Sequence, residues 1–123
     1  MIDVRDAVKE YANGKTVVRA LRGVSLRIGA GEFMSIAGPS GSGKTTLLNA
    51  VGCIDELTSG VVRIDGRDVT KTPPRELAAL RREKIGFVFQ SFNLIPVLTA
   101  YENVAFTLDL LGMKDSASRE AVT

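Results

Sequence analysis

The 123-residue sequence contains no histidine and a single cysteine, Cys53. One cysteine excludes an intrachain disulfide and any metal centre built from several cysteines, so we expect a buried or indifferent thiol. No apolar run approaches the roughly 20 residues that a membrane-spanning helix needs, and the first residues lack the apolar core of a signal peptide. Sixteen basic and fourteen acidic residues leave a net charge of +2, too small to indicate nucleic-acid binding. This composition predicts one globular, cytosolic domain.

The most informative stretch that is present follows the phosphate-loop pattern G-x-x-x-x-G-K-[ST]. Residues 33–37 before it form a short apolar run typical of a buried strand, and residues 45–51 after it indicate a helix. Strand, glycine-rich loop and helix are the context that supports the motif, and we expect this strand and helix to span residues 33–53. The motif residues, with the threonine that follows them, are Gly38, Pro39, Ser40, Gly41, Ser42, Gly43, Lys44, Thr45 and Thr46.

The spacing of this motif has a physical reason. Glycines let the backbone turn tightly and approach an anion, and successive N–H groups with the positive end of the helix dipole form an anion cradle. Lys44 supplies a mobile charge for β- and γ-phosphates, and the Thr45 hydroxyl is suited to ligate Mg²⁺. The alternative is a Gly/Ser-rich loop before an ordinary helix, with Lys44 as a solvated surface charge. The flanking strand and helix patterns favour the phosphate site.

The remaining N-terminal part predicts a small, mostly antiparallel sheet over about residues 1–32 and 61–70. Asn13-Gly14 is a strong hairpin signal, and residues 24–28 alternate as a half-buried strand does. This sheet leads into the phosphate loop.

The second half predicts two helices around a buried strand. Pro74 is suited to the first turn of a helix, and residues 85–89 form an apolar strand that delivers Gln90 into a loop ending near residue 98. Thr99-x-x-Glu102 is a capping box that opens the next helix.

Gly112 is expected to end that helix, and residues 116–123 have the pattern of a further helix that has just begun. We therefore expect that residues 99–123 begin a helical subdomain and that the sequence is cut within it.

Together these residues resemble the ATP-binding subunit of an ABC transporter, most of all the lipoprotein-releasing and macrolide-exporting group. The resemblance implies an α/β fold: a P-loop NTPase core of the ABC type with an N-terminal antiparallel β subdomain, truncated at the start of the helical subdomain. It runs from about residue 1 to 115. Beyond the phosphate loop, it depends on residues 20–26, 31–33, 58–60, 85–96 and 98–104.

The resemblance also implies roles for single residues. Tyr11 matches an aromatic that stacks on adenine, with Val18 beside it, and Gln90 matches the glutamine at the Mg²⁺ and attacking-water side of the γ-phosphate. ATP and Mg²⁺ are the implied ligands, with Thr45 and Gln90 on the metal. Without the resemblance, the residues favour an edge-strand tyrosine at position 11 and an ordinary loop glutamine at position 90.

Several parts of the family pattern are missing from the sequence. It has no Leu-Ser-Gly-Gly-type signature, no switch histidine and no apolar strand ending in Asp-Glu. Residues 53–56 imitate that strand but begin only nine residues after Lys44, too few for a helix and a return to a parallel strand, so we expect the end of the loop helix and the following turn there. Residues 61–65 also imitate it, but they contain an arginine and precede a hairpin turn, as an antiparallel strand does. We therefore expect residues 1–123 to be the N-terminal part of a nucleotide-binding domain that binds Mg-ATP weakly and hydrolyses it negligibly.

The sequence thus leads to two main functional hypotheses. The first is a subunit that couples ATP binding and hydrolysis to a membrane permease, for export or lipoprotein release. It would touch the permease through residues 92–98, between Phe92 and Leu98, act as a homodimer when full length, and lie at the inner face of the membrane. The second is a truncated nucleotide-binding module without turnover. A small kinase or GTPase would need a base-reading or acceptor motif, and we find neither.

Overall fold

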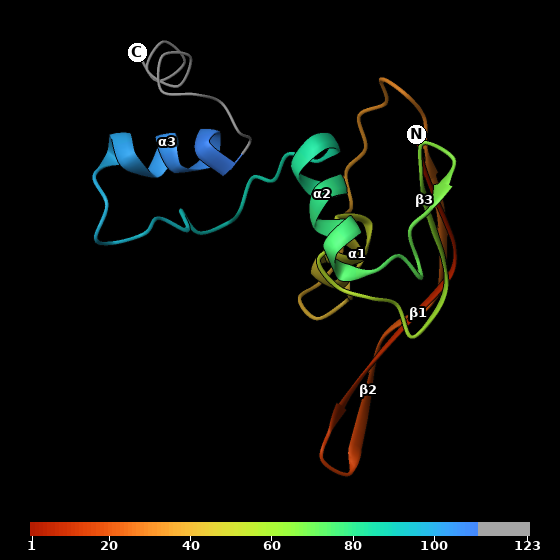
Figure 1. Cartoon of the computed structure of the whole chain (residues 1–123). Coiled ribbons are helices and arrows are strands. Elements are labelled where there is room, and N and C mark those ends of the chain that lie inside the picture. The colour runs from red at the N-terminus through yellow and green to blue at the C-terminus, as the bar shows by residue number, and fades with distance from the viewer. Residues whose placement is uncertain (111–123) are drawn as a thin grey trace. The chain divides into compact units, whose positions relative to one another are not determined.

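The computed structural model describes residues 1–110, which divide into two compact units (Figure 1). The first unit comprises residues 1–81 and contains a β-sheet, helix α1 (Lys44–Val51) and the start of helix α2 (Pro74–Lys84). The second begins at residue 82 and contains helix α3 (Ala100–Leu110). Within residues 1–110, the longest helices are too short to reach across a bilayer.

The sheet of the first unit has four strands in the order β2-β1-β3-β4, and every neighbouring pair is antiparallel. The strands are β1 (Ile2–Asn13), β2 (Thr16–Ile28), β3 (Ser59–Ile64) and β4 (Arg67–Asp68). Figure 1 shows β1 and β2 as a long hairpin. The antiparallel sheet expected from the sequence is therefore present.

Two glycines are needed for the way in which β1 pairs with its neighbours. Asn13 pairs with Thr16, and Gly14 in the intervening two-residue loop has a φ of 61°, a value that favours glycine. Farther along, the register of β1 shifts after Val4 and β1 bulges. A Cβ atom at Gly60 of β3 would lie 2.5 Å from the carbonyl oxygen of Asp6, so the bulge can approach β3 only where the side chain is absent.

The core of the first unit lies where α1 meets the hairpin strands β1 and β2. Alternating positions of the strands point their apolar side chains to this side, and α1 contributes Leu47 and Ala50. The buried apolar residues are Val4, Ala7, Leu21, Leu47, Ala50, Cys53, Val62, Ile64, Val69 and Leu77. The expectation of a buried thiol at Cys53 is confirmed, and burial raises the pKa of this thiol while the charge of Arg81 lowers it in part.

The two buried strands predicted at residues 33–37 and 85–89 are not found. Neither segment pairs with a strand of residues 1–110, and Phe33 and Val88 are 96% and 101% exposed. Apolar and β-branched residues favour an extended chain, but a strand also needs a neighbouring strand to complete its hydrogen bonds. The rings of Phe87 and Phe89 stack with centroids 5.6 Å apart, as side chains two residues apart do on an extended backbone.

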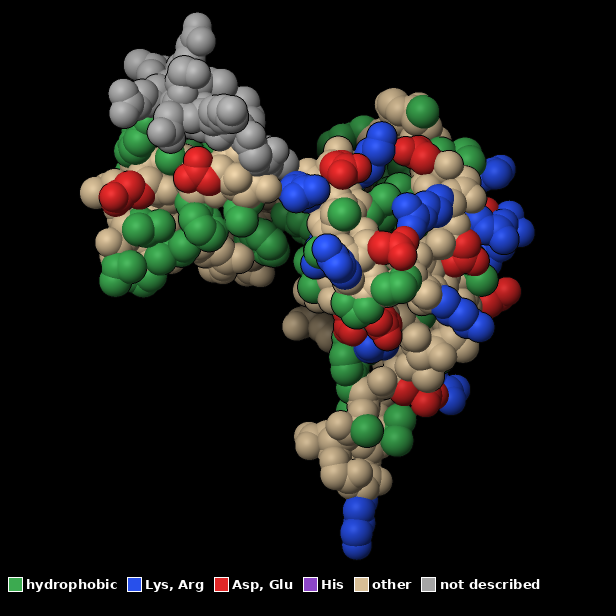
Figure 2. Space-filling view, viewed as in Figure 1, with side chains coloured by type: hydrophobic (Ala, Val, Ile, Leu, Met, Phe, Trp, Pro, Cys, Tyr) green, Lys and Arg blue, Asp and Glu red, His purple; other side chains and the backbone are tan. Residues whose placement is uncertain are grey.

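The second unit begins its main helix with the predicted capping box. The Thr99 N–H donates to Glu102 Oε2 over 2.7 Å, and the Glu102 N–H donates to Thr99 Oγ1 over 3.2 Å. The hydrogen bonds from the Thr99 backbone and hydroxyl lower the pKa of Glu102. Figure 2 shows hydrophobic side chains gathered over α3. The predicted helix end at Gly112 and the helix pattern at residues 116–123 lie outside the described residues.

Candidate functional site

The loop at residues 38–43 bends sharply at two glycines before it enters α1. Gly41 and Gly43 have φ angles of 78° and 88°, values that residues with a Cβ rarely adopt. A 3.3 Å hydrogen bond from the Ser42 N–H to the Pro39 carbonyl oxygen closes a turn inside the loop. The predicted motif is therefore a tight backbone curve that ends directly in a helix.

The start of α1 presents its backbone N–H groups without a side-chain cap. Gly43 is the N-cap residue, no side chain forms a cap hydrogen bond, and the first turn contains no acidic residue. The first N–H groups of a helix have no acceptor inside the helix, and the helix dipole adds partial positive charge at this end. A bound anion satisfies both features.

Close contacts hold the loop in place against the sheet. A Cβ atom at Gly43 would lie 2.4 Å from the carbonyl oxygen of Ala20 in β2. A Cβ at Gly38 would lie 2.9 Å from Ser42 Oγ, so the two ends of the loop also meet. The backbone contact leaves no space for a side chain at Gly43, whereas the atom nearest to Gly38 is a hydroxyl oxygen that can rotate away. The residues present therefore fit a compact phosphate group bound by backbone N–H groups.

Lys44 directs its ammonium group back onto this loop. Its Nζ donates to the carbonyl oxygens of Gly38 and Pro39 over 2.9 and 2.7 Å, and lies 3.4 Å from Ser42 Oγ. The residue is half-buried. This geometry differs from that of a freely solvated surface lysine, which was the alternative for this position. Thr45 and Thr46 follow in the first turn of α1.

Tyr11, the residue predicted to stack on the base, is held by two charged side chains of the same unit. Its hydroxyl donates to Asp55 Oδ2 over 2.7 Å. Lys9 donates to Asp55 Oδ1 over 2.6 Å, and its Nζ also lies over the Tyr11 ring, 5.0 Å from the centroid. Tyr11 is 40% exposed, and it pairs across the hairpin with Val18, the neighbour expected from the sequence. The ring is therefore anchored at its hydroxyl and still accessible.

Asp55 is the functional candidate that the sequence analysis missed. Residues 53–56 lie in the turn after α1, which ends at Val51, and the side chain of Asp55 reaches β1. Burial raises the pKa of Asp55, whereas the hydrogen bonds from Lys9 and Tyr11 and the charge of Lys9 lower it more, so its pKa lies below the ordinary value. The available signal was the placement of Lys9 and Tyr11 on one face of β1, where a carboxylate can meet both.

Gln90 and residues 92–98 belong to the second unit, and the phosphate loop belongs to the first. Gln90 follows the unpaired segment 85–89 and is exposed. Phe92 and Val97 are 94% and 88% exposed, as a contact surface requires. The joint metal site of Thr45 and Gln90, and the permease contact, stay predictions.

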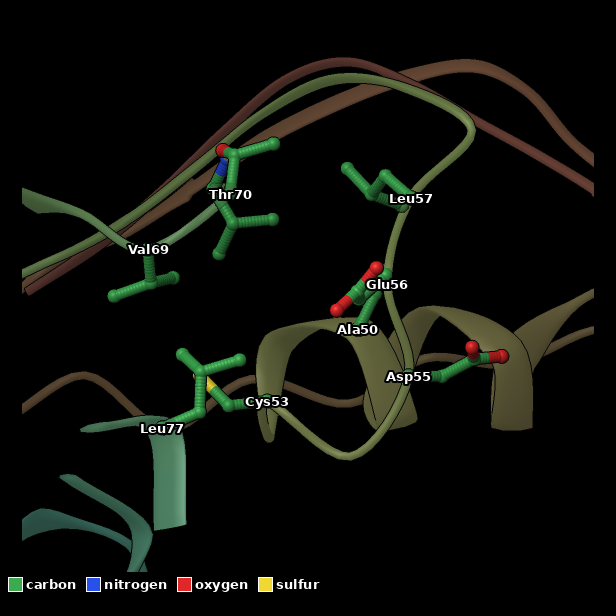
Figure 3. Close-up of a pocket in the computed structure, with 9 residues that line it drawn as sticks. Ala50, Cys53, Asp55, Glu56, Leu57, Val69, Thr70 and Leu77 are labelled. Carbon is green, nitrogen blue, oxygen red and sulfur yellow. The ribbon is translucent and has the colours of Figure 1, made fainter. Parts of the chain in front are cut away.

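A small pocket in the first unit does not serve as the nucleotide site. It lies where the end of α1 meets β3 and α2, and Figure 3 shows its lining with the Asp55 carboxylate turned away from Cys53 and Leu77. Its volume of about 20 Å³ is far below the roughly 300–1,000 Å³ of ordinary ligand pockets. The loop at residues 38–46 remains the best candidate among the described residues.

Comparison with known proteins identifies the class. The family described as ABC transporter matches residues 21–123. The chain therefore belongs to the ABC transporter family. The predicted family, and the predicted fold of an ABC-type ATPase core with an N-terminal antiparallel sheet, are both confirmed.

Individual relatives narrow the class to ATP-binding proteins. The chain is 52% identical over 108 residues to the ABC transporter ATP-binding protein MJ0796 of Methanocaldococcus jannaschii, covering 88% of this chain and 46% of that protein. It is 48% identical over 122 residues to the macrolide export ATP-binding/permease protein MacB of Syntrophobacter fumaroxidans, covering 98% of this chain and 17% of that protein. The chain thus spans less than half the length of these relatives.

A solved structure supports the same assignment. The dimeric, post-hydrolysis structure of the ATP-binding cassette MJ0796, bound to ADP and Pi, matches with a TM-score of 0.92 and 46% identity. The match covers 99% of this chain and 54% of that one.

Proposed function

We propose that this chain supplies the nucleotide-grasping part of a transport ATPase, in which ATP binding and hydrolysis drive a membrane permease. One observation carries the proposal: a glycine-bent loop, an uncapped helix start and the Lys44 ammonium group converge at residues 38–46. Each of these features favours phosphate. Membership of a family of ATP-binding transporter proteins supports the same ligand.

Each residue of the loop has a role in this proposal. The backbone from Gly38 to Gly43 encloses the phosphates with its N–H groups, and the N–H groups of Thr45 and Thr46 extend the cradle into α1. Lys44 exchanges its bonds to the loop carbonyls for bonds to the β- and γ-phosphate oxygens. This exchange costs little free energy because the ammonium group already lies at the loop.

Two further residues complete the nucleotide site. The exposed ring of Tyr11 stacks on the adenine base, which needs a flat apolar face. When bound, Mg²⁺ neutralises charge on the β- and γ-phosphates. The Thr45 hydroxyl in the first turn of α1 and the side chain of Gln90 are the groups that we assign to it.

The exposed loop at residues 92–98 is the surface that we assign to the permease. Exposed apolar side chains at Phe92, Leu94 and Val97 support this role. The full-length protein then acts as a homodimer at the inner face of the cell membrane, and residues 1–123 are the N-terminal part of its nucleotide-binding domain. A dimer is the state named for the solved MJ0796 cassette.

The test is equilibrium binding of Mg-ATP to the full-length protein by calorimetry. Lys44→Ala should weaken binding at least tenfold, because it removes the charge at the phosphate site. Lys15→Ala is the matched control, because it removes the same charge from the tip of the β1–β2 hairpin and should leave affinity unchanged. Equal effects of the two substitutions would refute a phosphate site at this loop.

Steady-state hydrolysis separates the transport ATPase from the alternative, a binding module without turnover. ATP turnover by the full-length protein, lost in Lys44→Ala, supports the ATPase. Tight binding without turnover, in the presence of the permease, supports the binding module. We predict that residues 1–123 by themselves hydrolyse ATP negligibly, and the same assay on that polypeptide tests this prediction.

A further inference from the structure

Asp55 connects the helix that follows the phosphate loop to the tyrosine on β1. Its backbone N–H donates to the carbonyl oxygen of Asn49 in α1 over 3.2 Å, and the neighbouring Ile54 N–H donates to the same oxygen over 2.8 Å. The turn that carries Asp55 is therefore tied to the last part of α1. The side chain of Asp55 in turn accepts the hydroxyl proton of Tyr11. One helix thus begins at the phosphate loop and ends at the anchor of the tyrosine.

Lys9 and Asp55 restrain different motions of the Tyr11 ring. The hydroxyl oxygen lies on the axis about which the ring rotates, so its hydrogen bond to Asp55 sets the direction of the side chain and leaves that rotation free. The Lys9 ammonium group, 5.0 Å from the ring centroid, favours the rotation that turns a ring face toward the cation. The two contacts together define the plane of the ring.

The same arrangement leaves part of the Tyr11 side chain accessible. Lys9 and Tyr11 are two residues apart on β1, and both side chains reach Asp55. The ammonium group covers one face of the ring, while Tyr11 as a whole remains 40% exposed. Lys9 is itself fixed by Asp55 Oδ1 and by the carbonyl oxygen of Glu56, 2.6 and 2.5 Å away. A base that stacks on the ring would therefore meet a surface that is already oriented.

We propose that Asp55 and Lys9 are positioning residues that preorganise the Tyr11 ring for stacking on the base of the nucleotide whose phosphates bind at residues 38–46. This inference rests on the base-stacking role of Tyr11 in the proposed function. Preorganisation raises affinity because the ring does not have to be ordered when the ligand binds. Neither Asp55 nor Lys9 contacts the nucleotide in this arrangement.

The test compares ATP with inorganic tripolyphosphate, a probe that has the phosphates and lacks the base, in binding to the full-length protein. Tyr11→Phe keeps the ring and removes the hydroxyl. It should weaken ATP binding about threefold to tenfold, the range that corresponds to the net contribution of one ordinary hydrogen bond, and leave tripolyphosphate binding within about twofold of the unsubstituted protein. Asp55→Ala should weaken ATP binding at least as much, because it also releases Lys9, and Asp109→Ala on α3 is a charge control that should have no effect.

The double substitution Tyr11→Phe/Asp55→Ala makes the comparison sharper. If the hydroxyl acts only through the carboxylate, the double variant should bind ATP no more weakly than Asp55→Ala alone. Multiplying effects would overturn the proposal. A loss of tripolyphosphate affinity equal to the loss for ATP would also overturn it, because the change would then act through the loop. If Asp55→Ala fails to fold, as judged by its thermal transition, Tyr11→Phe alone decides the outcome.

Tyr11→Ala separates this inference from the function on which it rests. It should weaken ATP binding about tenfold or more, because stacking on an aromatic ring contributes strongly to base binding. If Tyr11→Ala weakens binding and Tyr11→Phe does not, the positioning role is wrong and the stacking role stands. If Tyr11→Ala has no effect while Lys44→Ala abolishes binding, the stacking role itself is wrong, and the phosphate site stands alone.

Discussion

Gly43 packs directly on the backbone of Ala20, so closely that a Cβ atom would lie 2.4 Å from the Ala20 carbonyl oxygen. This contact joins the phosphate loop to the hairpin that carries Tyr11. Gly43 also has a φ of 88°, so it is needed both for its backbone conformation and for its lack of a side chain.

Gly43→Ala should therefore lower the free energy of unfolding by about 2–4 kcal/mol, the sum of left-handed strain and a steric clash with backbone. Gly41→Ala is the control, because Gly41 has a similar φ of 78° but nothing within 4 Å of a Cβ. It should cost about 1–2 kcal/mol. Urea unfolding measures both, and equal losses would show that the contact with Ala20 does not constrain the loop.

The stability of the protein should depend on the ionisation of Asp55. Because the pKa of Asp55 in the folded protein lies below the ordinary value of 3.8, its carboxylate contributes stability above about pH 3.8. That contribution is lost as the pH falls through the folded value. Unfolding free energies measured from pH 6 to pH 3 should fall less steeply in Asp55→Asn than in the unsubstituted protein. Parallel pH profiles would contradict the ion pair with Lys9.

Asn103 should hold the loop at residues 92–98 against α3. Its Oδ1 accepts the Ile95 N–H over 2.7 Å, and its Nδ2 donates to the Leu98 carbonyl oxygen over 3.1 Å. Asn103→Ala leaves these part-buried backbone groups unpaired, which should cost about 1–3 kcal/mol of local stability. Hydrogen exchange at the Ile95 amide should then accelerate by tenfold or more, whereas Asp109→Ala should leave it unchanged. An unchanged rate in Asn103→Ala would show that other contacts order the loop.

Gln90, which we assign to Mg²⁺, directly precedes the loop at residues 92–98 that we assign to the permease, so it should matter for coupling the two more than for nucleotide affinity. In the full-length protein with its permease, Gln90→Ala should reduce ATP-driven transport at least tenfold and change the affinity for ATP less than threefold. Ser91→Ala, at the neighbouring exposed position, is the matched control for changes to this loop. Transport that continues at the original rate in Gln90→Ala would contradict the proposed coupling.

Local patterns predicted the elements that depend on neighbouring residues. The Asn13-Gly14 pair predicted the hairpin, and Thr99 with Glu102 predicted the start of α3, because turns and helix caps are decided within a few residues. The segments at residues 33–37 and 85–89 show what local patterns cannot predict. Their composition indicates extended chain, but only another segment of chain can turn extended chain into a strand, and a local pattern does not contain that segment.

The candidate site also has a part that local patterns predict and a part that depends on contacts between distant residues. The glycine-rich loop and the helix that follows it were predicted because they depend on consecutive residues, and the binding of phosphate at this loop stays a prediction. The contact of Tyr11 with Asp55 joins residues 44 positions apart, and it forms only because the turn after α1 lies beside β1. The sequence of residues 53–56 resembles the end of a catalytic strand, but no local pattern shows that the Asp55 side chain contacts Lys9 and Tyr11.

The central claim is that the loop at residues 38–46 binds the phosphates of ATP. The most direct measurement is the change in backbone amide chemical shifts of the ¹⁵N-labelled full-length protein as Mg-ATP is added. The account predicts that, within residues 1–110, the largest changes occur at the amides of residues 40–46, and that Tyr11 shifts with ATP but not with tripolyphosphate. Changes centred instead on the pocket near Cys53 and Leu77, with the loop amides unmoved, would contradict it.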